Sequence, residues 1–239
     1  MADCANAEIT VNTLPEKGLV FEDYDSDGYP HSARWIGADG LTDAYCRSLF
    51  VNNAMGRRVT SLTIDSRITE IGSAAFICCN DLPDLIIPEN VTKIDVSAFS
   101  TCTRAKKIVL NNKITEIGQT AFYGCNLVND TDGFTFSATL KSLGYQTFFN
   151  NYSVPKFVFL GQCPNIPNNC FQLCSGVTLY DFSNCTTIPT LYSVESLGHA
   201  SGCVIRIPIA LSDTTLGTGN GWESATNWSA LTNIVWEVV

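Results

Sequence analysis

Residues 23–28 read DYDSDG, three alternating aspartates followed by a glycine, which is how an EF-hand calcium loop begins. Such a loop also takes a bidentate glutamate at position 12. Counted from Asp23, position 12 is Arg34, a cation in place of the carboxylate. The flanking segments LVFEDY and ARWIG alternate like strands, whereas an EF-hand needs helices. We therefore interpret residues 26–28, Ser-Asp-Gly, as the turn of a hairpin and expect no metal there.

A cluster of thiols could instead hold zinc, because Cys163, Cys170, Cys174 and Cys185 fall within a short stretch of chain. Ligand pairs of the C-x-x-C kind usually accompany such sites, and the sequence contains none. The total of eleven cysteines is odd, which argues against a closed disulfide framework. The alternative to zinc is a structural role, which the repeat pattern described below favours.

The two histidines, His31 and His199, are the residues that general acid–base chemistry would use most readily. Neither lies in a catalytic motif, since no nucleophile elbow, zinc-protease helix, phosphate loop or dinucleotide fingerprint occurs. A triad assembled in three dimensions has no sequence signature. The absence of motifs favours a protein that is not an enzyme, and this is our expectation.

Trp222, Trp228 and Trp236 gather near the C-terminus, where they could stack on a sugar or cover the last layer of a core. The first interpretation would make this segment a ligand site, and the second would make it a cap. We favour the cap, because aromatic side chains most often serve burial.

The composition restricts the function classes. The 239 residues are 45% hydrophobic and 15% charged, with a net charge of −9. A sizeable core is therefore expected, and binding to nucleic acid or anionic lipid is not. No run of about twenty apolar residues occurs, so the sequence predicts no membrane span. The opening MADCANAEIT lacks the basic and apolar parts of a secretory signal, so export is not expected.

The elements that must position these residues come from an internal repeat. The segments LTIDSRITEIGSAAFICC, LIIPENVTKIDVSAFSTC and IVLNNKITEIGQTAFYGC share one frame, which also fits residues 134–151 and 157–174. The spacing between reference phenylalanines is 23, 23, 26 and 23 residues. These are Phe76, Phe99, Phe122, Phe148 and Phe171. Degenerate units end at Phe50 and begin near Leu179.

Each unit opens with a short alternating segment that predicts a strand with one apolar face. The inward pairs are Leu62/Ile64, Leu85/Ile87, Ile108/Leu110, Phe134/Phe136 and Phe157/Phe159. Further apolar residues follow eight and five positions before the phenylalanine, as at Ile114 and Ile117, and a small residue precedes it. One unit cannot bury such a face alone, but stacked units build a continuous core, so we predict a solenoid.

The motif I-x-x-I-G-x-x-A-F-x-x-C at residues 114–125 resembles the BspA-type leucine-rich repeat. The resemblance implies a β-rich leucine-rich-repeat solenoid, with a parallel sheet on one face and short turns or helical pieces on the other. We expect an N-terminal cap with the hairpin and a degenerate first repeat over residues 1–60, repeats over 61–193 and a C-terminal cap over 194–239. The segment GWESATNWSALTNIVWEV resembles the helix-plus-strand end of such proteins, including those of gut bacteria and their phages.

The resemblance also gives most cysteines a structural place. One position, three after the reference phenylalanine, resembles the Asn/Cys ladder of leucine-rich repeats, whose side chains satisfy backbone groups of the turn. Its members are Asn53, Cys79, Cys102, Cys125, Asn151 and Cys174. Cys163, Cys170 and Cys185 occupy core positions of the frame, where cysteine acts as a small hydrophobe. No zinc or other cofactor is then expected, while Cys4, Cys46, Cys78 and Cys203 have no assigned place.

The central outward residues of the predicted strands form a β-branched and nearly uncharged stripe, the expected binding face. They are Thr63, Ile86, Val109, Thr135 and Val158. Sheet propensity alone could explain the residue types, but an exposed apolar stripe of this length more often marks an interaction surface. Two insertions, NNAMGRR with Arg57 and Arg58 and NLVNDTDG with Asp130 and Asp132, should lie together on one side.

These features predict a protein that binds rather than catalyses. We expect a virion-associated component of a phage, used for decoration or host attachment, with a bacterial cell-surface adhesin of the BspA type as the alternative. The expected partners are proteins of a larger assembly or a host receptor or glycan, and the chain could form a homo-oligomer.

Overall fold

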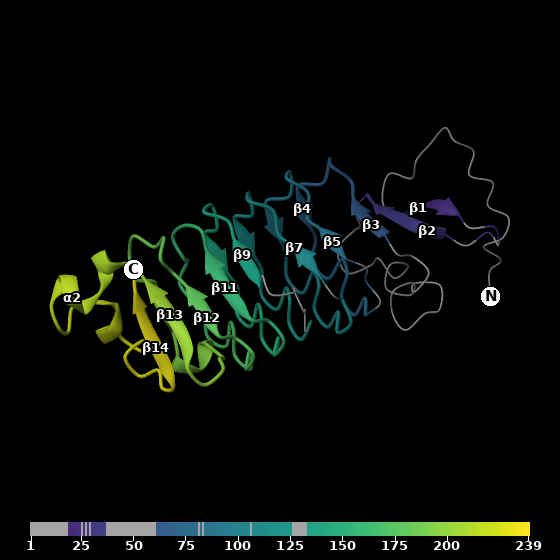
Figure 1. Ribbon diagram of the computed structural model, residues 1–239. Helices are drawn as coiled ribbons and strands as arrows, with labels where there is room; N and C mark the ends of the chain where they lie inside the picture. Colours follow the sequence, from purple (N-terminus) through teal and green to yellow (C-terminus); the bar gives the residue numbers. More distant parts are fainter. Residues whose placement is uncertain are drawn as a thin grey trace.

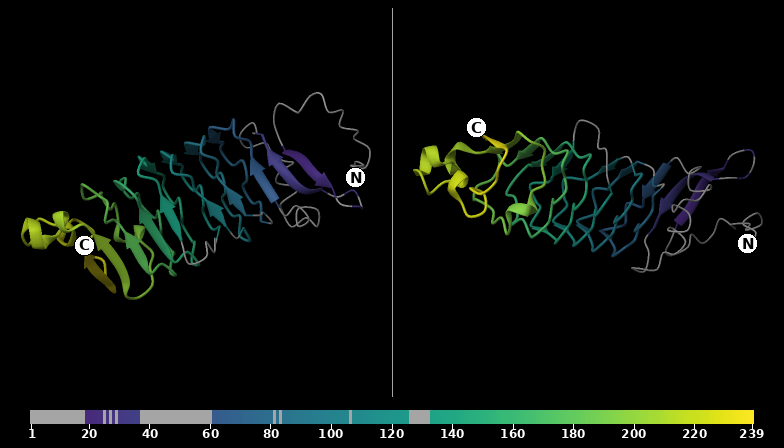
Figure 2. Two further views of the ribbon diagram at one scale, coloured as in Figure 1. Left: turned by 45° about the horizontal axis from the view of Figure 1, so that its top comes forward. Right: turned by 90° about the horizontal axis from the view of Figure 1, so that it is seen from below.

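The computed structural model describes residues 19–24, 26, 28, 30–36, 61–80, 82, 84–105, 107–125 and 133–239. Successive coils, each one repeat of the sequence, stack along a single axis, with the described N-terminal strands at one end and the C-terminus at the other (Figure 1; Figure 2). The β-rich solenoid expected from the sequence, with a parallel sheet on one face, is confirmed.

The expected hairpin lies at the N-terminal end of the described solenoid. Strands β1 (Leu19–Tyr24) and β2 (Pro30–Trp35) pair antiparallel. Ser26 lies in the turn between them, and Gly28 has a φ of 80°, a left-handed conformation that glycine adopts without strain. Strand β3 (Ser61–Ile64) then pairs parallel with β2. Asp25 and Asp27 lie outside the described residues.

One face of the solenoid carries a strand from each coil, and the paired strands after β2 run parallel. They are β3, β5 (Leu85–Ile86), β7 (Ile108–Val109), β9 (Phe134–Phe136), β11 (Lys156–Phe159), β12 (Leu179–Asp181), β13 (Cys203–Ile207) and β14 (Ile234–Val238). Their hydrogen bonding falls into three sheets, in the orders β1-β2-β3, β5-β7 and β14-β13-β12-β11-β9. We call this surface the sheet face.

A second, narrow sheet runs along the repeats. It consists of the two-residue strands β4 (Glu70–Ile71), β6 (Lys93–Ile94), β8 (Glu116–Ile117) and β10 (Ser142–Leu143), in the order β10-β8-β6-β4. The buried apolar residue of each strand, as in Ile94 beside Ile117, lies in register with the next. The apolar residue five positions before the reference phenylalanine is thus also a sheet position.

Helical pieces in the described part of the chain are confined to its C-terminal quarter. They are the 3₁₀ turns η3 (Val194–Ser196), η4 (Ile209–Leu211) and η5 (Trp222–Ser224) and the four-residue helix α2 (Asp213–Leu216). Of the helix-plus-strand end that the resemblance implied for residues 221–238, the strand β14 forms, whereas the helical part is only the 3₁₀ turn η5. Serine, threonine and asparagine recur in this segment and favour turns, and Asn227 takes a φ of 65° that ends any helix.

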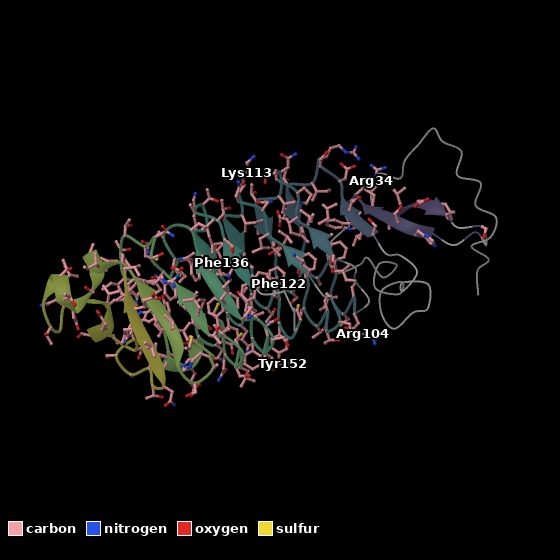
Figure 3. All side chains as sticks on the ribbon, in the orientation of Figure 1. Arg34, Arg104, Lys113, Phe122, Phe136 and Tyr152 are labelled. Atoms are coloured by element: carbon pink, nitrogen blue, oxygen red, sulfur yellow. The ribbon has the colours of Figure 1, made fainter. Side chains whose placement is uncertain are left out.

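The core is a column of aromatic rings along the axis. Phe122 is fully buried and stacks on Phe99 at 5.4 Å and on Phe148 at 5.0 Å between ring centroids. Figure 3 shows Phe122 and Phe136 inside the stack of coils, whereas Arg34, Lys113 and Tyr152 project from it. The inward strand residues are buried as expected, except that Leu110 is only partly buried.

Candidate binding surface

The ladder residues join each coil to the preceding one. Cys102 Sγ donates to Phe76 O at 3.0 Å, and Cys125 Sγ donates to Phe99 O at 2.8 Å. Asn151 Nδ2 makes the same contact with Phe122 O at 2.7 Å, and Cys174 Sγ reaches Phe148 O at 3.1 Å. Each ladder side chain therefore satisfies the carbonyl group of the reference phenylalanine one coil earlier. Cys79 is buried in the same slot, and Asn53 lies outside the described residues.

The remaining described cysteines also find structural places. Cys163, Cys170 and Cys185 are buried in the core. Cys203, unassigned from the sequence, is buried on the inner face of β13, and burial raises the pKa of its thiol to about 12. Cys78 is exposed, with its sulfur 3.0 Å from Thr101 Oγ1. Cys4 and Cys46 lie outside the described residues.

Thiol chemistry gives the first prediction. Burial raises the pKa of Cys174 to about 12 and that of Cys185 to about 11, so both stay protonated and unreactive near neutral pH. We expect a chromogenic disulfide reagent to react slowly with the buried thiols of the native protein. In denaturant without reductant it should count most of the eleven cysteines. A count near one, which five disulfides would leave, would contradict the structural role.

The geometry of Arg34 supports the hairpin interpretation of DYDSDG. Its Nη1 atom donates to Asp65 Oδ2 at 2.9 Å, so the arginine joins β2 to the end of β3. Arg67 also binds this carboxylate at 2.7 Å, and the two arginines, Arg67 first, hold the pKa of Asp65 well below its usual range. No cluster of three or more metal-ligating side chains occurs among the described residues, and the absence of a metal stays a prediction.

The histidines are not brought together. His31 is exposed on β2, at one end of the solenoid, and His199 precedes β13 near the other end (Figure 1). The Nδ1 atom of His199 lies 2.9 Å from Ala200 O. These two imidazoles therefore cannot share one catalytic site within a chain.

The three tryptophans pack in a row at the C-terminal end of the solenoid. Trp222 and Trp228 are buried against each other and against Phe182, at centroid distances of 5.3 and 5.5 Å from it. Trp236 on β14 is partly buried beside Trp228. Two buried indoles offer no open ring face to a sugar. Capping of the core by residues 194–239 remains our proposal, as does capping by residues 1–60.

The predicted stripe lies on the sheet face, where strand register brings its members side by side. Ile86 pairs with Val109, and Thr135 pairs with Val158. Ile86 is 72% exposed and Val109 37%, whereas Val158 is half-buried. We call the complete set the outward row: Arg34, Thr63, Ile86, Val109, Thr135, Val158, Asp181, Arg206 and Glu237.

The outward row becomes charged toward the C-terminus. Arg206 Nη1 donates to Asp181 Oδ2 and Arg206 Nε donates to Glu237 Oε2, both at 2.8 Å. This ladder of alternating charge was missed in the sequence because the repeat frame fades after residue 193. The alternating segments CVIRI and IVWEV were the signal that could have found it.

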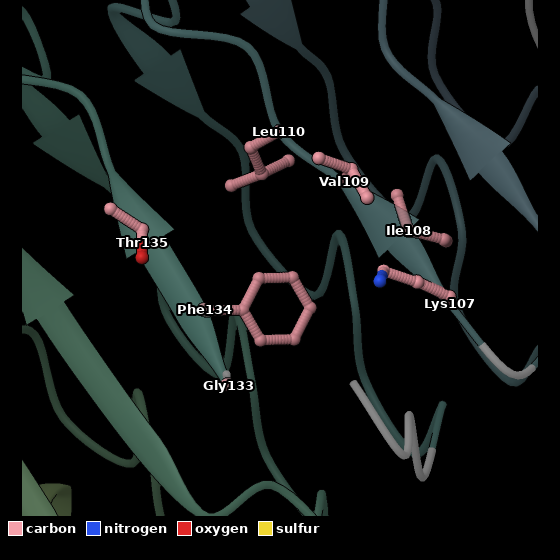
Figure 4. Close-up of a pocket in the computed structure, with 7 residues that line it drawn as sticks. All are labelled: Lys107, Ile108, Val109, Leu110, Gly133, Phe134 and Thr135. Atoms are coloured by element: carbon pink, nitrogen blue, oxygen red, sulfur yellow. The ribbon is translucent and has the colours of Figure 1, made fainter. Parts of the chain in front are cut away.

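A cleft interrupts the outward row between β7 and β9, which are not paired in the described structure. It has a volume of about 190 Å³ and is lined by Lys107, Ile108, Val109, Leu110, Gly133, Phe134 and Thr135. Figure 4 shows the ring of Phe134 between the two strands. The cleft thus joins two residues of the predicted stripe to a partly exposed leucine and a buried aromatic floor.

Both insertions fall outside the described residues, so the expected positions of Arg57, Arg58, Asp130 and Asp132 stay predictions. In the described part of the chain, no helix has the length and apolar character needed to cross a bilayer.

The profile of the BspA type leucine rich repeat region, in six copies, matches residues 54–131 and 128–193. No curated protein sequence matches this chain.

Two crystal structures of leucine-rich repeat proteins are similar. One, from Bacteroides ovatus, has 21% identity and a TM-score of 0.45, with 77% of this chain and 56% of that chain covered. The other, from Eubacterium ventriosum, has 16% identity and a TM-score of 0.41, with 87% and 68% covered. The match therefore spans little more than half of the Bacteroides ovatus protein.

Proposed function

Because the chain belongs to the BspA-type leucine-rich repeat family, we propose that it is a non-enzymatic binding protein that uses its sheet face. The observation that carries the proposal is the exposed pair Ile86 and Val109 beside the cleft between β7 and β9. An apolar side chain of a partner could enter this cleft while its backbone or neighbours cover the exposed pair. Sheet propensity accounts for the residue types but not for the hollow beside them.

The partner that fits this surface best is a protein. The members of the outward row from Ile86 to Val158 are β-branched and uncharged, and they lie beside a cleft whose lining residues are mainly apolar. A glycan site would need several polar groups directed at the sugar hydroxyls. The charged ladder of Asp181, Arg206 and Glu237 could border the contact and set its orientation, since rim charges give specificity more than affinity.

We place the protein in a phage particle, as a decoration or host-attachment component. In support, nine described cysteines are free and eight of these are buried, which suits folding in a reducing cytoplasm. A BspA-type adhesin on a bacterial surface is the alternative, and the family membership agrees equally with both. Mass spectrometry of purified particles and of cell-surface fractions from one source separates them. Enrichment in the surface fraction alone would overturn the particle assignment.

The sheet face is tested by Val109→Glu. The side chain points outward, so the variant should keep the melting temperature of the parent within a few degrees. Burying an unpaired carboxylate costs several kcal/mol, so binding to purified particles should weaken by roughly a hundredfold or more. Ile108→Glu is the matched control, because Ile108 is fully buried and the charge should unfold its coil. Leu110 is a weaker core control, since it is partly exposed at the cleft.

Co-sedimentation with the particles measures the binding. If Val109→Glu binds as the parent does, the sheet face is not the interface, and the insertions around Arg57 and Asp130 become the candidates. If the parent itself does not bind, the particle is not the partner.

A further inference from the structure

The last strand, β14, has one open side. Val239 donates its N–H to Ile207 O at 3.0 Å and accepts from Ile209 N at 2.7 Å, so both of its backbone groups face β13. Alternate residues of a parallel strand face alternate neighbours, so Ile234, Trp236 and Val238 direct their backbone groups away from β13. No other strand of the described residues pairs with β14. Among the described residues this side of β14 is therefore an open sheet edge, a surface that readily pairs with another strand.

Strand β14 itself contains no proline or lysine, and its register with β13 is unbroken. Proteins blunt open edges with proline, lysine, bulges or very short strands, but β14 has five residues, IVWEV, with a high sheet propensity. Its one charged side chain, Glu237, is bound by Arg206 at 2.8 Å. Val235 beside it is 52% exposed.

Apolar side chains around β14 are also left uncovered. On the preceding strand, the inward residues Cys203, Ile205 and Ile207 are fully buried. Val238 on β14, which is in register with Ile207, remains 37% exposed. Ile209, whose N–H donates to Val239 O, is 55% exposed. A further layer against this end of the solenoid would bury these residues.

We propose that the open edge pairs with β14 of a second copy, antiparallel about a twofold axis through Trp236. The strand is self-complementary in this arrangement. On the inward side, Trp236 faces Trp236 of the second copy, and Ile234 faces Val238, so apolar meets apolar. On the outward side, Val235 faces Glu237 of the second copy, so the two carboxylates do not face each other. The contact is isologous and closes as a dimer.

The mass in solution tests the proposal first. Light scattering after size exclusion should give twice the monomer mass of 26.0 kDa at micromolar concentration. Val238→Pro removes an N–H that points out of the sheet and no bond within the chain, so it should give a folded monomer. Val238→Thr keeps the N–H and the side-chain shape and should remain dimeric. A monomeric parent, a mass above the dimer, or a dimeric Val238→Pro would each overturn the pairing.

The register is tested by charge at Val235, an exposed position where substitution should leave the monomer folded. Val235→Glu places like charges opposite each other at two symmetric positions, so the dissociation constant should rise roughly tenfold. Val235→Lys places opposite charges there and should hold the dimer at least as well as the parent. Sedimentation equilibrium measures both constants. Equal effects of the two substitutions would show that Val235 does not face Glu237, and the antiparallel register would be wrong.

Discussion

Phe122→Ala is expected to lower the free energy of unfolding by about 3–5 kcal/mol, as for other fully buried phenylalanines. The ring lies in the middle of the aromatic column, between Phe99 and Phe148, and also contacts Phe134 at 5.7 Å. Its removal opens a cavity between coils whose backbones are held in register by the narrow sheet of β6, β8 and β10, so the neighbours can close it only in part. Urea denaturation followed by circular dichroism measures the loss.

The adjacent Tyr123 is the control. It is half-buried and stacks on Phe149 at 5.0 Å outside the core, so Tyr123→Ala should cost only about 1 kcal/mol. Repeat proteins can unfold in stages, so the two variants are compared by their unfolding midpoints and by the full shape of their unfolding curves. Equal losses for the two variants would mean that the column of rings does not hold the coils together.

Asn151→Ala should destabilise the protein by about 1–3 kcal/mol, because it leaves the buried carbonyl of Phe122 without its side-chain donor. The amide donates to Phe122 O at 2.7 Å and to Phe148 O at 2.9 Å. Only the second of these carbonyls keeps another side-chain donor, the thiol of Cys174 at 3.1 Å. The lost hydrogen bond therefore weakens the junction between the third and fourth complete coils.

Asn151→Cys is the informative partner of this change. Cysteine fills the same slot at Cys125 and reaches the preceding coil at 2.8 Å. The substitution also removes Asn151 Oδ1, a buried acceptor without a hydrogen-bond partner among the described residues. We expect the free energy of unfolding of Asn151→Cys to be within about 1 kcal/mol of that of the parent and clearly higher than that of Asn151→Ala. Thermal and urea unfolding of the three proteins decide the point, and equal loss for both variants would show that the slot does not act as a ladder.

The single coil could be predicted from the sequence because its determinants are local. Three features recur in one frame: an alternating strand, an apolar residue and a phenylalanine five positions after it, which returns every 23 to 26 residues. In the third complete coil they are the strand at Ile108, then Ile117 and Phe122. No coil can bury such a face alone, so the repeat itself requires stacking. The same frame placed the ladder cysteines. The turn interpretation of DYDSDG came instead from counting the ligand positions of a calcium loop, because Arg34 stands where a carboxylate is needed.

The candidate site was only partly predictable. The frame selected the outward residues of each strand, Ile86 and Val109 among them, but not the cleft beside Val109 or the charged ladder on Arg206. The helical part expected within residues 221–238 is only the 3₁₀ turn η5 for a related reason, because that segment lies beyond the repeat and its turns are set by burial of Trp222 and Trp228.

The sequence by itself determined the period, the inward and outward faces and the family, because each is fixed by the order of side chains within one coil. Only the tertiary structure decided how neighbouring coils meet. The narrow sheet through Ile94 and Ile117, the gap between β7 and β9 and the ion pairs of Arg206 all depend on register between coils. Register is set by backbone hydrogen bonds and packing across 23 or more residues of chain, which no local pattern specifies.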